Sequence, residues 1–185
     1  ITPSYLVVII CILYDVGQVN FAVCPSKLSG TSGDIHKLKA TSLTLRASFN
    51  NRTLRTISRK TSPYFQKPFR AVYGNIDGQE LRIRYPQHQR FSIENTDIWI
   101  THIGGYPGRY ACEVTPEIYI HPPQLFISGH SHILKVLYDK TLHCLHINPG
   151  AAGMYGFHKK RTLVRFAIDK GEFKDLEVIE LADNR

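Results

Sequence analysis

The first part of this sequence lacks acidic residues. Residues 1–70 contain ten Lys and Arg but no Glu, and their only acids are Asp15 and Asp34, whereas about nine acids are typical of seventy residues in a globular protein. Residues 71–185 carry thirteen residues of each sign, so the net charge of +8 belongs entirely to the first part. A basic chain usually indicates an anionic partner, but this distribution gives no such indication for residues 71–185.

Long hydrophobic runs are also missing. Residues 5–13 form a nine-residue apolar run, and a transmembrane helix needs about 20 residues. A signal peptide is disfavoured because no Lys or Arg precedes the run and no suitable small-residue cleavage site follows it. We therefore expect residues 5–13 to be the first buried strand of a single α/β domain.

Paired cysteines are missing as well. The four cysteines show no Cys-x-x-Cys spacing, so the sequence indicates neither a zinc ribbon nor a disulfide framework. Cys112 and Cys144 are expected to be buried free thiols, in a helix and in a strand respectively. Unpaired cysteines are typical of a reducing compartment, so the cytoplasm is the expected location.

The chain does contain four loops of one kind, each reached from an apolar strand. The segments are residues 70–78, 98–105, 125–132 and 143–152, and their loops contain Gly-Asn-Ile-Asp, Thr-His-Ile-Gly, Gly-His-Ser-His and Asn-Pro-Gly-Ala. Side chains that follow neighbouring strands converge at one edge of a sheet. His130 and His132 are two residues apart, so they lie on the same side of an extended chain. Because imidazole is a common ligand of transition metals, the pattern predicts a metal site.

In this order and spacing, the loops resemble the motifs of the binuclear metallophosphoesterases, the calcineurin-like phosphoesterase superfamily. Within it they are similar to the small YfcE-like phosphodiesterases of bacteria and archaea, over residues 67–181. The resemblance implies an α/β fold, a four-layer α/β/β/α sandwich, although the atypical first part leaves the completeness of its N-terminal layer open. It also implies hydrolysis of a small phosphoester by water activated between two divalent metal ions. Neither a membrane nor a nucleic acid is the implied partner, and a homo-oligomer is left open.

Manganese is the expected metal, with Ni, Fe, Co and Zn as alternatives, because Asn and His suit such ions whereas calcium prefers oxygen ligands. The residues that the resemblance assigns to the two ions are Asp34 as the bridge, Asn75, His102 and His130 on one ion, and His132 on the other. Asp34 and His102 are also assigned to catalysis. Arg109 and His158 lie in polar loops and are expected to meet the substrate phosphate.

Asp77 and the other histidines are outside this set. Asp77 is expected either to orient a metal-bound group or to cap backbone amides of its own turn. His143 and His146 are three residues apart on one expected strand, so they point to opposite faces. His88 and His121 are expected at the surface.

Residues 1–66 are atypical of the family. Its members begin with a strand that carries Asp-x-His-Gly and a second strand that ends in Gly-Asp, whereas this chain has Gly33-Asp34-Ile35-His36. We interpret this motif as the Gly-Asp. Residues 26–32 can be written in codons whose sequence also encodes Val-Glu-Ile-Ile-Trp-His-Val-Gly when the reading frame starts one nucleotide earlier. Such a segment is typical of the strand before that motif.

One hypothesis is therefore that residues before Phe65 are partly an out-of-frame translation, in frame near Gly33 and again at Lys67. The alternative is a diverged or appended segment, with residues 41–62 as a disordered basic arm. Both are compatible with a single metallophosphoesterase domain over residues 1–185, and sequencing of the source DNA distinguishes them. An incomplete metal site would make the chain a catalytically impaired or non-catalytic metal-binding protein, whose basic arm binds nucleic acid or an anionic surface.

From residue 67 onward the expected secondary structure is mixed. The expected strands are 70–73, 81–85, 89–94, 98–101, 124–128, 133–138, 141–147, 161–169 and 173–181. The expected helix is 106–118, because Pro107 suits a first helical turn and Tyr110, Val114 and Ile118 recur at four-residue spacing.

Overall fold

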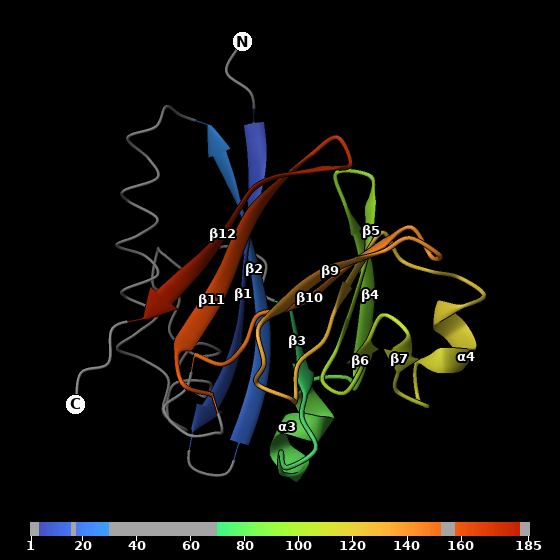
Figure 1. Cartoon of the computed structure of the whole chain (residues 1–185). Helices are drawn as coiled ribbons and strands as arrows, with labels where there is room; N and C mark the ends of the chain where they lie inside the picture. Colours follow the sequence, from blue (N-terminus) through green and yellow to red (C-terminus); the bar gives the residue numbers. More distant parts are fainter. Residues whose placement is uncertain (1–3, 16–17, 30–69, 153–157, 182–185) are drawn as a thin grey trace.

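Two five-stranded sheets form most of the described part of the chain. The computed structural model describes residues 4–15, 18–29, 70–152 and 158–181. The first sheet has the order β12-β11-β1-β2-β3, with β1 (Ser4–Asp15), β2 (Gln18–Ser29), β3 (Arg70–Tyr73), β11 (Arg161–Asp169) and β12 (Glu172–Leu181). The second has the order β4-β5-β8-β10-β9, with β4 (His88–Ile93), β5 (Thr96–Thr101), β8 (Leu125–Ile127), β9 (Lys135–Asp139) and β10 (Cys144–Asn148). The sheets face each other (Figure 1).

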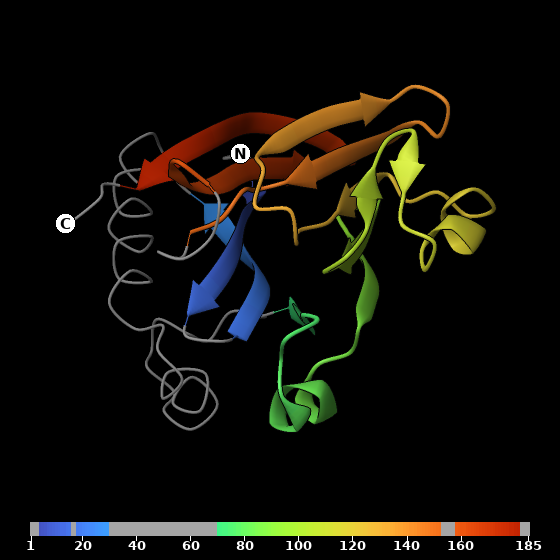
Figure 2. The same ribbon diagram turned by 60° about the horizontal axis from the view of Figure 1, so that its bottom comes forward.

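The main hydrophobic core lies between the two sheets. The second sheet contributes alternate residues of its central strands, such as Ile98, Ile100 and Ile127, and the first sheet contributes Val164 and Phe166. All five side chains are fully or almost fully buried. Figure 2 shows the two β layers from a second direction. Burial of this apolar surface supplies the main driving force that holds the layers together.

The outer face of the second sheet carries a helical layer. Trp99 and Phe126, which alternate with the inward-facing residues of β5 and β8, pack there against Val114 and Ile118. The last of these belongs to the short helix α4 (Thr115–Ile118). Because β5 and β8 are thus buried on both faces, their sequences are almost continuously apolar, as is typical of central parallel strands.

Most of the expected strands are confirmed, but residues 81–85 are helical. They belong largely to α3 (Gln79–Arg84), in which the Tyr85 N–H donates to the Leu81 carbonyl at 2.8 Å. The apolar alternation that indicated a strand does not define a buried face, because Leu81 is buried whereas Ile83 is 82% exposed. A five-residue alternation is too short to distinguish the two structures.

The expected helix over residues 106–118 is also wrong for most of its length. The strands β6 (Gly105–Tyr106) and β7 (Arg109–Tyr110) form a small hairpin. Within residues 106–118, α4 is the only helical part. Gly108 has a φ of 81°, which a turn here requires and which a helix interior does not accommodate. Cys112 lies after this hairpin and is exposed, so its expected burial is wrong, whereas Cys144 is buried as expected.

The first part of the chain is described only in part. Residues 5–13 are a strand, as expected, within β1, which pairs with β2 over its full length from Ser4 opposite Ser29 to Asp15 opposite Gln18. The strand β2 was not predicted. Two segments lie outside the described residues, namely the proposed basic arm, residues 41–62, and the motif of residues 33–36.

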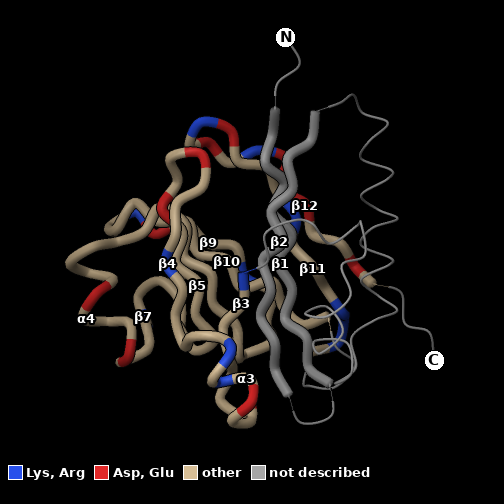
Figure 3. The backbone as a smooth tube through the Cα atoms, turned by 180° about the vertical axis from the view of Figure 1, so that it is seen from behind, with Lys and Arg blue, Asp and Glu red and all other residues tan. Residues whose placement is uncertain are grey.

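Charges of both signs are interspersed along the described residues from 70 onward, as Figure 3 shows in blue and red. This distribution agrees with the equal numbers of acidic and basic residues in that part of the sequence. Neither α3 nor α4, the helices of the described residues, is long and apolar enough to cross a membrane.

Tyr110 and Asp139 join the small hairpin to the second sheet. Tyr110 Oη donates to Asp139 Oδ2 at 2.8 Å, and the N–H groups of Thr141 and Leu142 donate to Asp139 Oδ1 at 2.9 and 3.1 Å. Burial raises the pKa of Asp139, but these hydrogen bonds outweigh it, so the pKa is below its usual value. The ionised carboxylate is therefore the form that stabilises the fold.

We predict that Tyr110→Phe lowers the free energy of unfolding by about 1.5–3 kcal/mol at neutral pH, since it removes a hydrogen bond to a charged group. The stabilisation by Asp139 is complete above its unfolded-state pKa of about 3.9 and disappears as pH falls through the lower folded-state pKa. The loss measured by urea unfolding should therefore shrink in acid. Equal losses at neutral and acidic pH would contradict the prediction. Tyr138→Phe, at an exposed position, is the control and should change stability by less than about 0.5 kcal/mol.

Candidate metal centre

The ends of three parallel strands bring the candidate site together. Strands β5, β8 and β10 run parallel, so the loops that follow them leave the sheet at the same edge. The loops are hydrogen-bonded to one another: the Gly129 N–H donates to the His102 carbonyl at 2.9 Å, and Asn148 Nδ2 donates to the Gly129 carbonyl at 3.0 Å. Strand β3 of the first sheet delivers Asn75 to the same place.

Three potential ligand atoms converge there. His102 Nε2 lies 3.1 Å from Asn75 Oδ1 and 3.3 Å from His130 Nδ1. Ligands on one ion with bonds of about 2.0–2.2 Å are separated by roughly 3 Å, so these spacings fit two imidazoles and an amide oxygen around a single divalent ion. Asn75 and His130 are exposed, which leaves the centre accessible to a substrate. The donor set suits borderline metals rather than calcium.

His102 is held in the neutral form that can bind a metal. The residue is 3% exposed. Burial lowers the pKa of His102 to about 4, with a further contribution from His130 and His132. Its imidazole is therefore uncharged at neutral pH and keeps a lone pair for coordination.

His130 and His132 reach the site through a strained turn rather than an extended chain. Their φ angles are 65° and 57°, and the Ser131 N–H donates to the Gly129 carbonyl at 2.7 Å. The left-handed conformation is uncommon for residues other than glycine and costs about 1–3 kcal/mol each. The expected extended geometry of this segment is wrong, although both histidines lie close enough to affect the pKa of His102.

His132 and His158 lie side by side near this cluster. Their ring centroids are 5.7 Å apart in an edge-on arrangement. Burial lowers the pKa of His132, and the His158 and His130 rings lower it further. His158 thus lies beside His132, a predicted metal ligand, and its role in substrate binding stays a prediction. Arg109 is exposed on β7, and Asp34, the predicted bridge, lies outside the described residues.

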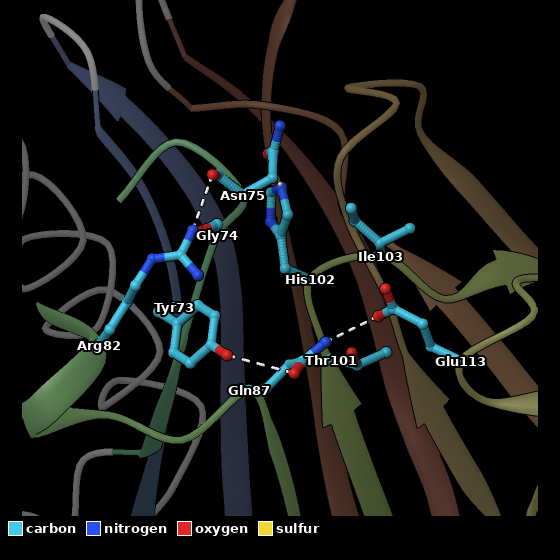
Figure 4. Close-up of a pocket in the computed structure, with 9 residues that line it drawn as sticks. All are labelled: Tyr73, Gly74, Asn75, Arg82, Gln87, Thr101, His102, Ile103 and Glu113. Atoms are coloured by element: carbon cyan, nitrogen blue, oxygen red, sulfur yellow. Dashed lines mark hydrogen bonds between the residues drawn. The ribbon is translucent and has the colours of Figure 1, made fainter. Parts of the chain in front are cut away.

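Arg82 and Asp77 fix the loop that carries Asn75. Arg82 Nε donates to the Asp77 carbonyl at 2.7 Å. Arg82 Nη2 donates to the Asn75 carbonyl at 2.8 Å (Figure 4). The Asp77 side chain is buried, and its Oδ2 accepts a hydrogen bond from the Gly74 N–H at 2.6 Å. Of the two roles considered for Asp77, the contacts match the capping of its own turn. Sequence reasoning missed Arg82 because residues 81–85 were assigned to a strand.

Ser128 and His146 support the neighbouring loop and were also missed. Ser128 Oγ donates to the Gly105 carbonyl at 3.0 Å and lies 2.9 Å from His146 Nε2. His146 is fully buried. His143 is exposed, but the two do not share one strand as expected, because His143 precedes β10 in a turn with a φ of 51°. A polar residue within the apolar run of β10 was the available signal. His121 is exposed as expected, but His88 is only partly so, because it packs against Trp99 with ring centroids 6.0 Å apart.

Residues 33–171 match the model of the calcineurin-like phosphoesterase superfamily domain. The chain therefore belongs to the calcineurin-like phosphoesterase superfamily, and its facing sheets are those of an α/β metallophosphoesterase fold. This membership confirms the resemblance that the four loops carry. No curated protein matches the sequence.

Several solved structures are similar to the chain. An archaeal phosphodiesterase is 22% identical over 60% of this chain and 67% of its own, with a TM-score of 0.44. A protein of Thermotoga maritima is 21% identical over 60% of this chain and 64% of its own, with a TM-score of 0.41. A single mutant of Vps29 from Entamoeba histolytica is 18% identical over 60% of this chain and 68% of its own, with a TM-score of 0.44. The matched part thus spans 64–68% of the length of these relatives.

We predict that Arg82→Ala weakens manganese binding about tenfold, since partners that orient metal ligands typically contribute 10–100-fold to affinity. Without the guanidinium, the loop carbonyls lose their donors and Asn75 is no longer held. Isothermal titration calorimetry with Mn²⁺ measures the effect. Arg84→Ala, on the same helix, is the matched control and should bind manganese within twofold of the wild type. Wild-type affinity in Arg82→Ala would show that Arg82 does not position the ligand.

Proposed function

We propose that the chain is a metal-dependent phosphoesterase that hydrolyses small phosphoesters, phosphodiesters in particular, with two divalent ions at the edge of the second sheet. Membership of the superfamily supports a phosphoesterase in general. The observation that carries the proposal is the position of His102 Nε2, which lies 3.1 Å from Asn75 Oδ1 and 3.3 Å from His130 Nδ1. No part of this arrangement suggests a covalent enzyme intermediate.

In the proposed centre, each residue has a separate task. The residues that would hold the ions are Asn75, His102 and His130 on one side, His132 on the other, and Asp34 between them. When bound, two such ions supply an activated water and neutralise charge on the phosphate. His102 contributes an imidazole that is buried and neutral. His158, which lies against His132, would donate a hydrogen bond to a phosphate oxygen, and Arg109 would do the same.

Manganese is the metal we propose, and Ni, Fe, Co and Zn are the alternatives that the same donor set accepts. The close approach of His102 Nε2 and His130 Nδ1, at 3.3 Å, supports a divalent ion shared by both rings, whichever of these metals it is. Two imidazoles so near to each other cannot both carry a proton charge at low energetic cost. A cation between the two nitrogens stabilises their neutral forms, so the pair is suited to bind a metal.

We predict that His130→Ala lowers Mn²⁺-stimulated hydrolysis of bis-p-nitrophenyl phosphate by at least about 100-fold, because it removes a ligand of the ion that activates water. The control is His121→Ala, which should retain full activity. His121 is an exposed histidine that contacts Glu117 at the surface. Circular dichroism of both variants shows whether the fold is intact. Undiminished hydrolysis by a folded His130→Ala protein would rule out this centre as the catalytic one.

A second candidate function rests on a specific observation. Within the described residues, no group of three or more His, Cys, Asp or Glu side chains gathers around one point. A complete two-metal site therefore depends on residues such as Asp34, and without them the chain would be a metal-binding protein of little or no activity. Heparin retention that disappears when residues 1–66 are removed would favour this candidate and its basic arm.

We predict two manganese ions per chain by elemental analysis of the purified protein after manganese loading and desalting. Each ion contributes to binding of the phosphate, so the rate of hydrolysis should rise with the number of manganese ions per chain. One ion or none, combined with no hydrolysis, would instead support the metal-binding candidate.

A further inference from the structure

A cavity of about 200 Å³ opens beside the candidate metal centre (Figure 4). Asn75 and His102 form the part of its wall that adjoins the centre, and Tyr73, Gln87 and Glu113 are among the residues of the remaining wall. Pockets for drug-sized ligands measure about 300–1,000 Å³, so this cavity suits a smaller group, of the size of one sugar ring. Because it shares two residues with the centre, a group that fills it can be attached to a phosphate held there.

A chain of hydrogen bonds organises the far wall of the cavity. Tyr73 Oη donates to Gln87 Oε1 at 3.2 Å, and Gln87 Nε2 donates to Glu113 Oε2 at 2.7 Å. The three side chains come from the end of β3, the segment between α3 and β4, and the turn before α4. Glu113 is the last acceptor in this series of hydrogen bonds. Its second carboxylate oxygen, Oε1, is available to a ligand.

The negative charge of Glu113 is not neutralised by a salt bridge to any residue that the structure describes. His88 lies within the field of this carboxylate, but burial lowers the pKa of His88 and outweighs the influence of Glu113, so the ring is neutral at neutral pH. An ionised carboxylate accepts hydrogen bonds and donates none. Around Glu113 the cavity therefore favours a ligand group that presents hydrogen-bond donors.

Two kinds of donor group fit a carboxylate, namely hydroxyl groups and cationic amines. A cation is disfavoured because Arg82 also lines the cavity and places its guanidinium over the Tyr73 ring, 4.7 Å from the centroid. The aromatic face that would attract an ammonium group is thereby occupied. Two adjacent hydroxyls match a carboxylate, because Oε1 is open and Oε2 can accept a second hydrogen bond beside that from Gln87; acidic residues bind ribose hydroxyls in this way in nucleotide sites.

We propose that this cavity binds the alcohol part of the substrate through a vicinal diol, that Glu113 determines this specificity, and that sugar phosphoesters such as nucleotide esters are the substrate class. The inference rests on the proposed function, because it takes the phosphate to lie at the metal centre. It assigns to Glu113 a contact with the substrate and no part in the bond-breaking step.

The test is the binding of uridine monophosphate and dideoxyuridine monophosphate to the full-length, manganese-loaded protein by isothermal titration calorimetry. The second nucleotide lacks both hydroxyls of the diol. The wild type should bind the diol nucleotide about tenfold more tightly, as expected for hydrogen bonds to a charged acceptor. In Glu113→Gln this preference should fall below threefold, while the affinity for the dideoxy nucleotide stays within twofold of the wild type. Glu117→Gln, an exposed carboxylate paired with Arg90 and His121, is the matched control and should keep the preference.

The outcomes separate this inference from the proposed function. Four outcomes overturn the inference. Two concern the wild type, namely a preference for the diol nucleotide below twofold and binding of neither nucleotide. The other two outcomes are a preference that survives in Glu113→Gln and tighter binding of aminoethyl phosphate than of both nucleotides. Hydrolysis of bis-p-nitrophenyl phosphate, which has no hydroxyl group, is measured alongside. Hydrolysis without a diol preference leaves the proposed function standing, whereas a diol preference without hydrolysis supports the cavity assignment and contradicts the proposed function.

Discussion

The parallel alignment of β5, β8 and β10 is the constraint on which the metal centre depends. Because these strands are buried and run in one direction, the loops after them must leave the sheet together. The hydrophobic core fixes the register, since a slip of one residue would turn Ile98 and Ile127 away from the first sheet. The positions of His102 and His130 are thus set by apolar packing several residues before the ligands themselves.

Sequence reasoning succeeded where a local pattern had a local cause. The strands are short apolar runs that end at glycine or polar residues, and burial of both faces makes such runs continuous. It failed at residues 81–85, where five residues cannot distinguish a strand from a helix, and at residues 106–118, where the turn at Gly108 outweighs a helical spacing of apolar residues.

The candidate site divides in the same way. Asn75, His102 and His130 could be predicted because their motifs lie at strand ends and resemble those of a known family, and the structure brings them together. Arg82 and Ser128 could not be predicted as supports, because their partners lie in loops that are adjacent only after folding. The backbone strain at His130 was equally inaccessible, since a φ angle of 65° is the result of the surrounding contacts.

The short helix α3 gives the centre a kinetic property. Its residues are mostly exposed, with Leu81 as its buried residue, and Arg82 on this helix holds the Asn75 carbonyl. Helices of one or two turns with little buried surface open locally at a small fraction of the free energy of global unfolding. Each such opening frees the Asn75 loop while both sheets stay folded. In the proposed centre, release of an ion would then require only the fraying of α3, because the Asn75 loop depends on a helix that is anchored by one buried residue.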